Sequence, residues 1–345
     1  MNGAPTTSNK SSSHEIDFVA YHDLQAQVGL SAFQHLSESM RCNWLIGPHS
    51  RPSPRAVGAV MLDHSCFQRN VRKGSPGYRY LFHVPHDLAD LSVYRGEDSL
   101  GAYDILFTPT ALHSAVARNC YRDKTKIVET GWPKYDLMAI PDSHKELANT
   151  LQSLPYPVTV LYAPTEPKYY EWQDLFPTLL NYPGINVIVK NHICVNPGQP
   201  YPAGLEEDYA CALRSADEME RAVTSMHSDR LVVAPRTLNI CSLFPSVDLV
   251  ISDSSSVLAE FLPFRNSVET GRHGRGISDC VPEISKIFPD IKYVPTQALL
   301  EILSRGRLHE LVQPRPPRQP RDRYGLLRPA AGRRIADEIV RHLAA

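Results

Sequence analysis

The chain has 345 residues, of which 42% are hydrophobic and 21% are charged, and these proportions exclude a fibrous or wholly disordered protein. The 36 basic residues nearly balance the 37 acidic ones, and the net charge of −1 argues against a global polyanion binder of the nucleic-acid type. The length favours two domains. Positive charge is concentrated near one end, because residues 305–341 carry ten arginines and four acids, a local +6 that leaves −7 for the rest.

The start of the chain and its cysteines indicate where the protein resides. Residues 1–14 are rich in Ser, Thr and Asn, and we expect a disordered leader there. The seven cysteines are odd in number and form no Cys-x-x-Cys pair, so we expect reduced thiols rather than disulfides or zinc ligands. No stretch approaches the roughly 20 apolar residues that span a bilayer, and no signal peptide is recognisable. These features predict a cytoplasmic protein.

Short apolar runs alternate with longer amphipathic ones between residues 15 and 140. The runs with strand character are 16–21, 43–46, 56–62, 80–84, 103–108 and 126–129, and 25–39 has helical character. Strands separated by helical segments predict βαβ units and a parallel sheet. We therefore expect an N-terminal Rossmann-like, acceptor-side domain over residues 15–140.

A second series of the same kind follows a proline-bracketed connection over residues 141–157. Its strand-like runs are 158–162, 185–190, 231–234, 249–252 and 266–269, and its helix-like runs are 172–180 and 257–264. The series predicts a nucleotide-binding domain over 158–311, then a Pro/Arg-rich linker over 312–331 and a C-terminal helix over 332–345. The predicted fold class is α/β, with two Rossmann-like domains whose parallel sheets face a central cleft.

The most informative segment joins the strand at 249–252 to the helix that follows it. Ser252, Asp253, Ser254, Ser255 and Ser256 gather hydroxyls and backbone N–H groups where that helix begins. Such a helix end suits a phosphate or pyrophosphate. The alternative is that one serine only caps the helix.

Polar residues also follow two other strands of the second series. Thr165 comes after the strand at 158–162, and Lys190 and His192 lie at the end of the strand at 185–190 and just beyond it. Ligands of open α/β sheets bind outside the carboxyl ends of the strands, so these residues are predicted to converge with the serines. A solvated loop is the alternative for Lys190 and His192.

His83 and His86 end a strand of the first series, where we expect them to face the cleft. Histidine is the default general base near neutral pH, and Asp87 could orient a neighbouring ring. The His-x-x-His spacing is also typical of a zinc site, for which His64, Asp63 and Cys66 are further candidate ligands. No compact ligand set completes the pair, so we expect no metal. Gly131 opens another turn that could line the cleft, or could simply connect two elements.

Five short motifs, in this order, resemble the CDP-glycerol glycerophosphotransferase family of teichoic-acid and capsule polymerases. They are 104–110 (DILFTPT), 129–136 (ETGWPKYD), 161–165 (LYAPT), 189–192 (VKNH) and 252–257 (SDSSSV). The likeness spans about residues 80–270, and the last motif is the most specific, although Ser252 and Ser254 stand where the family has Thr and Tyr. The resemblance implies a GT-B type fold without a cofactor.

The resemblance also implies an activity and a set of site residues. A glycerol-phosphate, polyol-phosphate or sugar unit would pass from a nucleotide-activated donor, CDP-glycerol or a relative, to a glycan or lipid-linked acceptor in cell-envelope polymer synthesis. His86 most nearly corresponds to the family's base histidine, and His83 stays a competitor because the flanking Trp and Gly of the family motif are missing. The implied catalytic residues are His86, His83 and His192. The implied donor-binding residues are Lys190, Thr165, Asp253, Ser254, Ser255, Ser256 and Gly131.

Two other functions stay open. A UDP-N-acetylglucosamine 2-epimerase-like enzyme shares the twin Rossmann-like design and would convert a nucleotide sugar without any acceptor. A non-catalytic nucleotide-sugar-binding subunit would bind the donor without turnover.

The basic segment near the end offers a possible surface contact. Arg315, Arg318, Arg321, Arg323 and Arg328 could meet an anionic lipid or a polyanionic acceptor, which would make the protein peripheral on the inner face of the cytoplasmic membrane. The alternative is a solvated linker. We expect no nucleic-acid partner.

Overall fold

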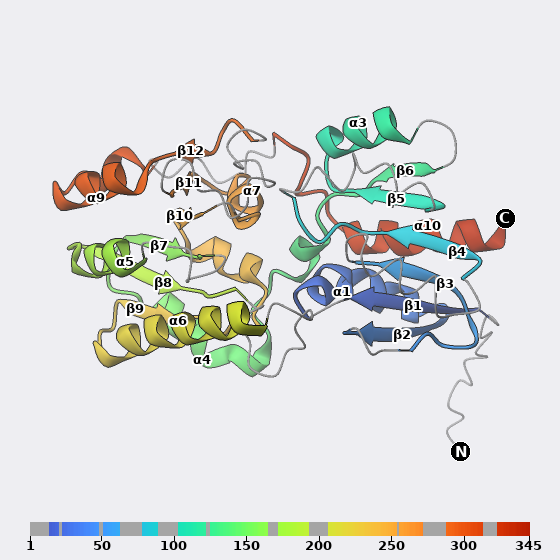
Figure 1. Cartoon of the computed structure of the whole chain (residues 1–345), viewed down its shortest axis with the longest axis horizontal. Coiled ribbons are helices and arrows are strands. Elements are labelled where there is room, and N and C mark those ends of the chain that lie inside the picture. The colour runs from blue at the N-terminus through green and yellow to red at the C-terminus, as the bar shows by residue number, and fades with distance from the viewer. Residues whose placement is uncertain are drawn as a thin grey trace, which may run out of the picture.

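Two α/β halves stand side by side, each built on a six-stranded sheet (Figure 1). The computed structural model describes residues 14–20, 23–47, 51–62, 78–88, 103–121, 125–164, 172–192, 206–253, 255–271, 288–312 and 323–345. Within these ranges every paired strand runs parallel to its neighbour. Two parallel-sheet α/β domains of this kind make up the GT-B-like class that the sequence predicted.

The first sheet has the strand order β2-β1-β3-β4-β5-β6. Its strands are β1 (Glu15–Ala20), β2 (Arg41–Ile46), β3 (Ala56–Met61), β4 (Tyr80–His83), β5 (Ile105–Thr108) and β6 (Lys126–Glu129). Among the described residues, this half has the helices α1 (Asp23–Ser37), α3 (Ala111–Cys120) and α10 (Ala331–Ala344). All residues of β1 and β5 are buried, because a parallel sheet of this kind is covered on both faces.

The second sheet has the strand order β9-β8-β7-β10-β11-β12. Its strands are β7 (Val158–Tyr162), β8 (Ile185–Val189), β9 (Leu231–Val233), β10 (Leu249–Ser252), β11 (Ser267–Glu269) and β12 (Lys292–Tyr293). Its helices are α5 (Trp172–Asn181), α6 (Glu206–Ser225), α7 (Val257–Phe261) and α9 (Thr296–Ser304). This is the 3-2-1-4-5-6 order of a doubly wound sheet, in which the winding reverses between β7 and β10.

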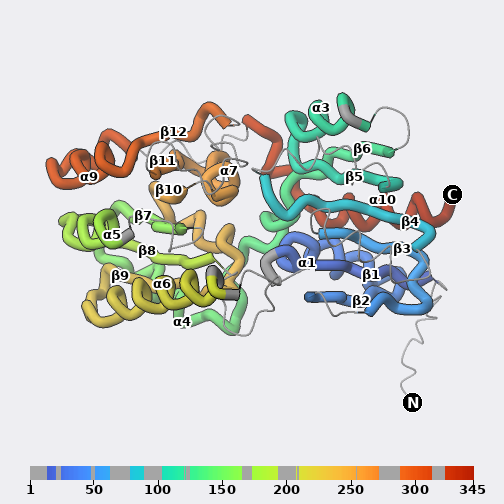
Figure 2. The backbone as a smooth tube through the Cα atoms, in the orientation of Figure 1, coloured from blue at the N-terminus to red at the C-terminus, as the bar shows by residue number. Residues whose placement is uncertain are grey.

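Short elements join the halves. The 3-10 helix η2 (Pro133–Leu137) and the helix α4 (Lys145–Gln152) lead from β6 to β7, and a second 3-10 helix, η6 (Ile240–Ser246), precedes β10. Figure 2 shows that the last part of the chain, coloured red, lies against the first half again. Helix α10 packs on α1 there, and Gly332 permits the approach, because a Cβ atom at this position would lie 2.2 Å from the Ser31 hydroxyl.

Several predicted strands are confirmed to the residue, namely 126–129, 158–162 and 249–252. The helix predictions need correction, because α3, α6 and α9 were not predicted and α7 is shorter than predicted. The 20-residue α6 was not predicted, because its buried face is marked mainly by small alanines such as Ala212 and Ala216, which give a weak apolar signal. The helix predicted over 257–264 ends at Phe261, so α7 has only five residues. Among the described residues, no helix is both long and apolar enough to cross a bilayer.

Candidate active site

The carboxyl ends of β7, β8 and β10 meet at one edge of the second sheet. Strand β7 pairs in parallel with β10 on one side and with β8 on the other. The Ser252 hydroxyl joins two of these ends by donating to the Ala163 carbonyl. The reversal of winding between β7 and β10 is where doubly wound sheets bind their ligands. Thr165 and Ser254, two of the predicted donor-binding residues, lie outside the described residues.

Ser255 and Ser256 connect β10 to α7 and are both partly exposed, whereas Asp253 is 5% exposed. The Ser256 hydroxyl makes no capping bond to the helix, so this side chain is not a simple N-cap. The backbone N–H of Ser255 donates to the Asp253 carbonyl at 2.6 Å. Because α7 is so short, its dipole is smaller than that of the longer helix predicted from the sequence. The Ser256 hydroxyl donates to the Glu260 carboxylate at 3.5 Å, and the Ser255 hydroxyl accepts from the backbone N–H of Val257 at 3.5 Å.

Lys190 directly follows β8 and is almost completely buried, at 6% exposure. Its ammonium donates to the Arg236 carbonyl at 2.9 Å and to the Asn191 carbonyl at 3.3 Å. Burial, and then the neighbouring Lys134, lower the pKa of Lys190 to about 7, with Glu220 and Glu260 acting in the opposite direction. An ammonium has three N–H donors, so one remains beyond the two carbonyls.

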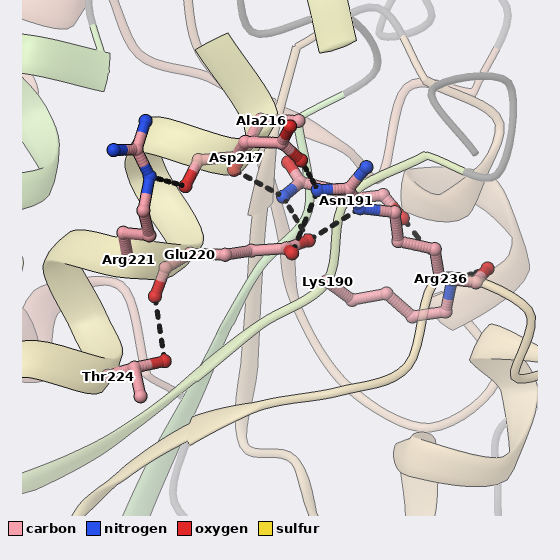
Figure 3. A network of polar contacts seen from close by, with 8 residues as sticks. All are labelled: Lys190, Asn191, Ala216, Asp217, Glu220, Arg221, Thr224 and Arg236. Atoms are coloured by element: carbon pink, nitrogen blue, oxygen red, sulfur yellow. Dashed lines mark hydrogen bonds and ion pairs between the residues drawn. The ribbon is translucent and has the colours of Figure 1, made fainter. Parts of the chain in front are cut away.

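A network of polar contacts lies beside Lys190 and includes the residue that follows it, Asn191 (Figure 3). The Arg236 guanidinium holds the Glu220 carboxylate through two bonds, of 2.7 and 2.8 Å, and reaches Asp217 at 2.6 Å. The Asn191 amide donates to the same Glu220 carboxylate at 2.7 Å. Sequence reasoning missed Glu220 and Arg236, because α6 itself was not predicted and Arg236 follows a strand of only three residues. His192, next along the chain, is partly exposed at this edge.

The contact between the two halves, formed by η2 and α7 and called the seam below, contains a buried ion pair. Lys134 in η2 lies 2.8 Å from both carboxylate oxygens of Glu260 in α7, and both side chains are buried. Burial alone would lower the pKa of Lys134, but attraction to Glu260, with smaller contributions that include Asp87, raises it above its usual value. The Tyr135 hydroxyl also donates to the Glu260 carbonyl. The turn after β6 therefore faces the segment that carries Ser255 and Ser256.

The two histidines after β4 differ in their surroundings. His83 is 1% exposed at the end of the strand, where its ring lies 5.1 Å from the Tyr103 ring. His86 is partly exposed, and Asp87 next to it is close enough to Lys134 to affect its pKa. His83 therefore packs against Tyr103 in the first half, and its assignment as a catalytic residue stays a prediction. His86 remains the candidate base, beside the seam.

A third histidine, not singled out in the sequence, fixes the loop after β4. His113 in α3 is completely buried, with Nε2 3.1 Å from the Leu88 carbonyl and Nδ1 2.6 Å from the Thr110 hydroxyl. A carbonyl only accepts, so the Nε2–H tautomer donates to Leu88. Burial lowers the pKa of His113 to about 4 and keeps the ring neutral near pH 7.

Gly131 has a packing role that the sequence did not reveal. Its φ of +89° is a conformation that glycine adopts readily, and a Cβ atom here would lie 2.7 Å from the Arg328 Cβ atom. The next residue, Trp132, donates its backbone N–H to the Leu326 carbonyl at 3.1 Å. Gly131 thus lies under the returning C-terminal segment, and its assignment to the donor site stays a prediction.

Most described arginines of the basic segment pair within the chain. The ion pairs are Arg305 with Glu301, Arg307 with Glu310, Arg323 with Asp290, Arg328 with Glu129 and Arg341 with Glu338. Arg315, Arg318 and Arg321 lie outside the described residues, as do His64, Asp63 and Cys66. Among the residues that are described, no group of three His, Cys, Asp or Glu side chains could hold a metal ion.

Two doubly wound parallel sheets of this kind define a GT-B-like fold. A family model agrees: CDP-glycerol:poly(glycerophosphate) glycerophosphotransferase matches residues 94–266, half of the chain. The chain belongs to this family, and it is a transferase that uses a nucleotide-activated donor. No curated protein sequence matches the chain.

Solved structures share the fold across nearly the whole chain. The S. aureus MnaA–UDP structure has a TM-score of 0.58 at 10% identity and covers 96% of this chain and 97% of its own. A structure of the wall teichoic acid polymerase TagF with CDPG has a TM-score of 0.57 at 12% identity and covers 97% and 90%. The UDP-GlcNAc 2-epimerase of Methanocaldococcus jannaschii has a TM-score of 0.55 at 9% identity and covers 95% and 100%. These identities bear on the fold alone.

Proposed function

We propose that this protein transfers glycerol phosphate from CDP-glycerol, or a closely related polyol phosphate from its CDP donor, to a hydroxyl of a glycan or lipid-linked acceptor in cell-envelope polymer synthesis. The proposal is supported by the placement of Ser255 and Ser256 after β10 and of Lys190 after β8, the two strands that flank β7, within the residues that the family model matches. Hydroxyl donors and an ammonium at such an edge suit a diphosphate. We assign the donor-binding domain to residues 158–311 and the acceptor side to residues 15–140.

The proposed reaction is a displacement at phosphorus. The acceptor hydroxyl attacks the phosphorus that carries the glycerol while His86 takes the hydroxyl proton. The bond from that phosphorus to the bridging oxygen breaks, and CMP leaves. Lys190, His192, Ser255 and Ser256 stabilise the charge on the transferred and departing phosphates.

Alanine substitutions test these roles through the release of CMP. With CDP-glycerol as the donor and a short synthetic poly(glycerol phosphate) primer as the acceptor, we expect His86→Ala to lower kcat by about 10²-fold or more, because a general base contributes that much. Ser255→Ala should weaken donor binding as well as turnover. The controls are His309→Ala and Ser304→Ala, because His309 and Ser304 are exposed and lie far in the sequence from His86 and Ser255. Undiminished turnover in both site variants, folded as the parent is, contradicts the assignment.

The choice of donor can be measured without an acceptor. A ligand that binds only the folded state raises the apparent stability, so we expect CDP-glycerol or CDP-ribitol to raise the melting temperature more than UDP-GlcNAc does. The epimerase alternative predicts the reverse order, together with conversion of UDP-GlcNAc in the absence of any acceptor. A binding subunit would show the shift with CDP-glycerol but no CMP release with any primer.

We infer that any contact with an anionic membrane is made by Arg315, Arg318 and Arg321, because Arg323 and Arg328 are held in ion pairs. Substitution of these three arginines by Gln should abolish flotation with phosphatidylglycerol vesicles. The same charge change at Arg214, Arg221 and Arg305 is the matched control. Equal flotation of the two triple variants would remove the assignment.

A further inference from the structure

Glu220 and Arg236 hold the residues on either side of the Lys190 ammonium. The Glu220 carboxylate accepts from the Asn191 amide, directly after Lys190, and from the Arg236 guanidinium. The Arg236 carbonyl in turn accepts from the Lys190 ammonium. One carboxylate on α6 therefore fixes both the end of β8 and the carbonyl that orients the lysine (Figure 3).

We propose that Glu220 and Arg236 are positioning residues that hold Lys190 toward the donor phosphates and set its charge. Neither side chain needs to touch the donor. This inference rests on the proposed function, in which Lys190 balances the diphosphate.

The charges around Lys190 come from four elements of the fold. Glu220 projects from α6 and Arg236 follows β9, while Lys134 in η2 and Glu260 in α7 approach from the seam. Glu220 and Glu260 favour the ammonium, whereas burial, Lys134 and Arg236 disfavour it. Among these charges Lys134 acts most strongly on Lys190 and Glu220 next, and the two pairs, Lys134 with Glu260 and Arg236 with Glu220, each place one favourable and one unfavourable charge near the ammonium.

This arrangement predicts opposite effects for the two substitutions. Glu220→Gln removes a charge that favours the ammonium, so the pKa of Lys190 should fall by about 1 unit. Arg236→Met removes a charge that disfavours it and leaves Glu220 without its partner, so the pKa should rise by a similar amount. A role confined to structural support would not move the titration in two directions.

NMR of protein labelled with 13C at the lysine ε carbons measures this titration without donor or acceptor, and Lys190→Arg assigns the signal. Glu218→Gln and Arg221→Met, exposed on the same helix, should leave the Lys190 midpoint in place. In transfer assays, the alkaline limb of the pH profile should move to lower pH in Glu220→Gln and to higher pH in Arg236→Met. If one variant does not fold, the other decides the proposal alone.

The two proposals fail in distinguishable ways. An unchanged Lys190 midpoint in a folded Glu220→Gln or Arg236→Met variant overturns the positioning role, whatever the activity. Midpoints that move in the expected directions in a protein that releases no CMP support the positioning role and count against the proposed donor instead.

Discussion

Lys134 and Glu260 form a buried ion pair that joins the two halves of the molecule, with the ammonium 2.8 Å from each carboxylate oxygen. Lys134 lies in η2 after the first sheet, and Glu260 lies in α7 after the serines of the second sheet. The pair therefore ties the turn beside Asp87 to the segment proposed to bind the donor.

Breaking this pair should destabilise the protein strongly. Lys134→Met or Glu260→Met should each cost about 3 to 5 kcal/mol of unfolding free energy, because the loss of one partner leaves the other buried and unpaired, or removes its hydrogen bonds. Combining Lys134→Met with Glu260→Met should cost less than the sum of the single changes, since no uncompensated charge remains. Urea denaturation of the parent, the two single variants and the double variant measures the coupling energy. If the two losses of unfolding free energy simply add, the pair is not coupled.

The buried His113 makes stability depend on pH. Its pKa is lowered to about 4 in the folded protein from an ordinary 6.5, so between these values the unfolded chain binds the extra proton. The unfolding free energy should therefore rise with pH from about 4 to 6.5, by up to about 3 kcal/mol from this residue.

Urea midpoints across this pH range check the contribution of His113. His113→Phe should flatten the slope, whereas His309→Phe, at an exposed position, should retain it. The same slope in His113→Phe as in the parent would assign the effect to other groups.

Gly131→Ala should be more harmful than the same change at Gly184. Both glycines have positive φ, +89° and +73°, but a Cβ atom at Gly131 meets Arg328 at 2.7 Å, whereas nothing lies within 4 Å of one at Gly184. Backbone strain costs about 1 to 2 kcal/mol at either position, and only Gly131 adds a clash. Thermal unfolding of the two variants isolates the clash, and equal losses would show that the C-terminal segment does not press on Gly131.

Asp136 caps the last helix from another part of the chain. Its carboxylate accepts from the backbone N–H groups of Ala331 and Gly332, at 3.1 and 2.7 Å, and from the Ser31 hydroxyl at 2.8 Å. Asp136→Ala should cost about 1 to 2 kcal/mol, as the loss of an N-cap does, and should speed proteolysis near α10. Asp142→Ala, at an exposed position, should do neither. Unchanged proteolysis of the Asp136 variant would remove the capping role.

The alternation of strands and helices was readable in the sequence because parallel strands buried on both faces form apolar runs such as 158–162 and 249–252. The placement of Ser255 and Lys190 at one edge of the second sheet was also predictable, since each follows a strand and the carboxyl ends of parallel strands share an edge. The burial of His83 was not, because its position at a strand end does not say which side of the sheet it faces.

The residues that support the site could not be recognised from the sequence, for a physical reason. Glu220 and Arg236 act through a contact between a helix and a loop that are distant from Lys190 in the sequence, and single charged residues on a polar helix normally indicate a solvated face. Lys134 and Glu260 are likewise 126 positions apart. Only packing brings such pairs together.

The central claim is tested most directly by 31P NMR of the protein with CDP-glycerol and a poly(glycerol phosphate) primer. We predict that the diphosphate signals disappear while CMP and new phosphodiester signals grow together, and that both changes are lost in His86→Ala. Intact CDP-glycerol in the presence of primer, combined with acceptor-free conversion of UDP-GlcNAc, would contradict the account.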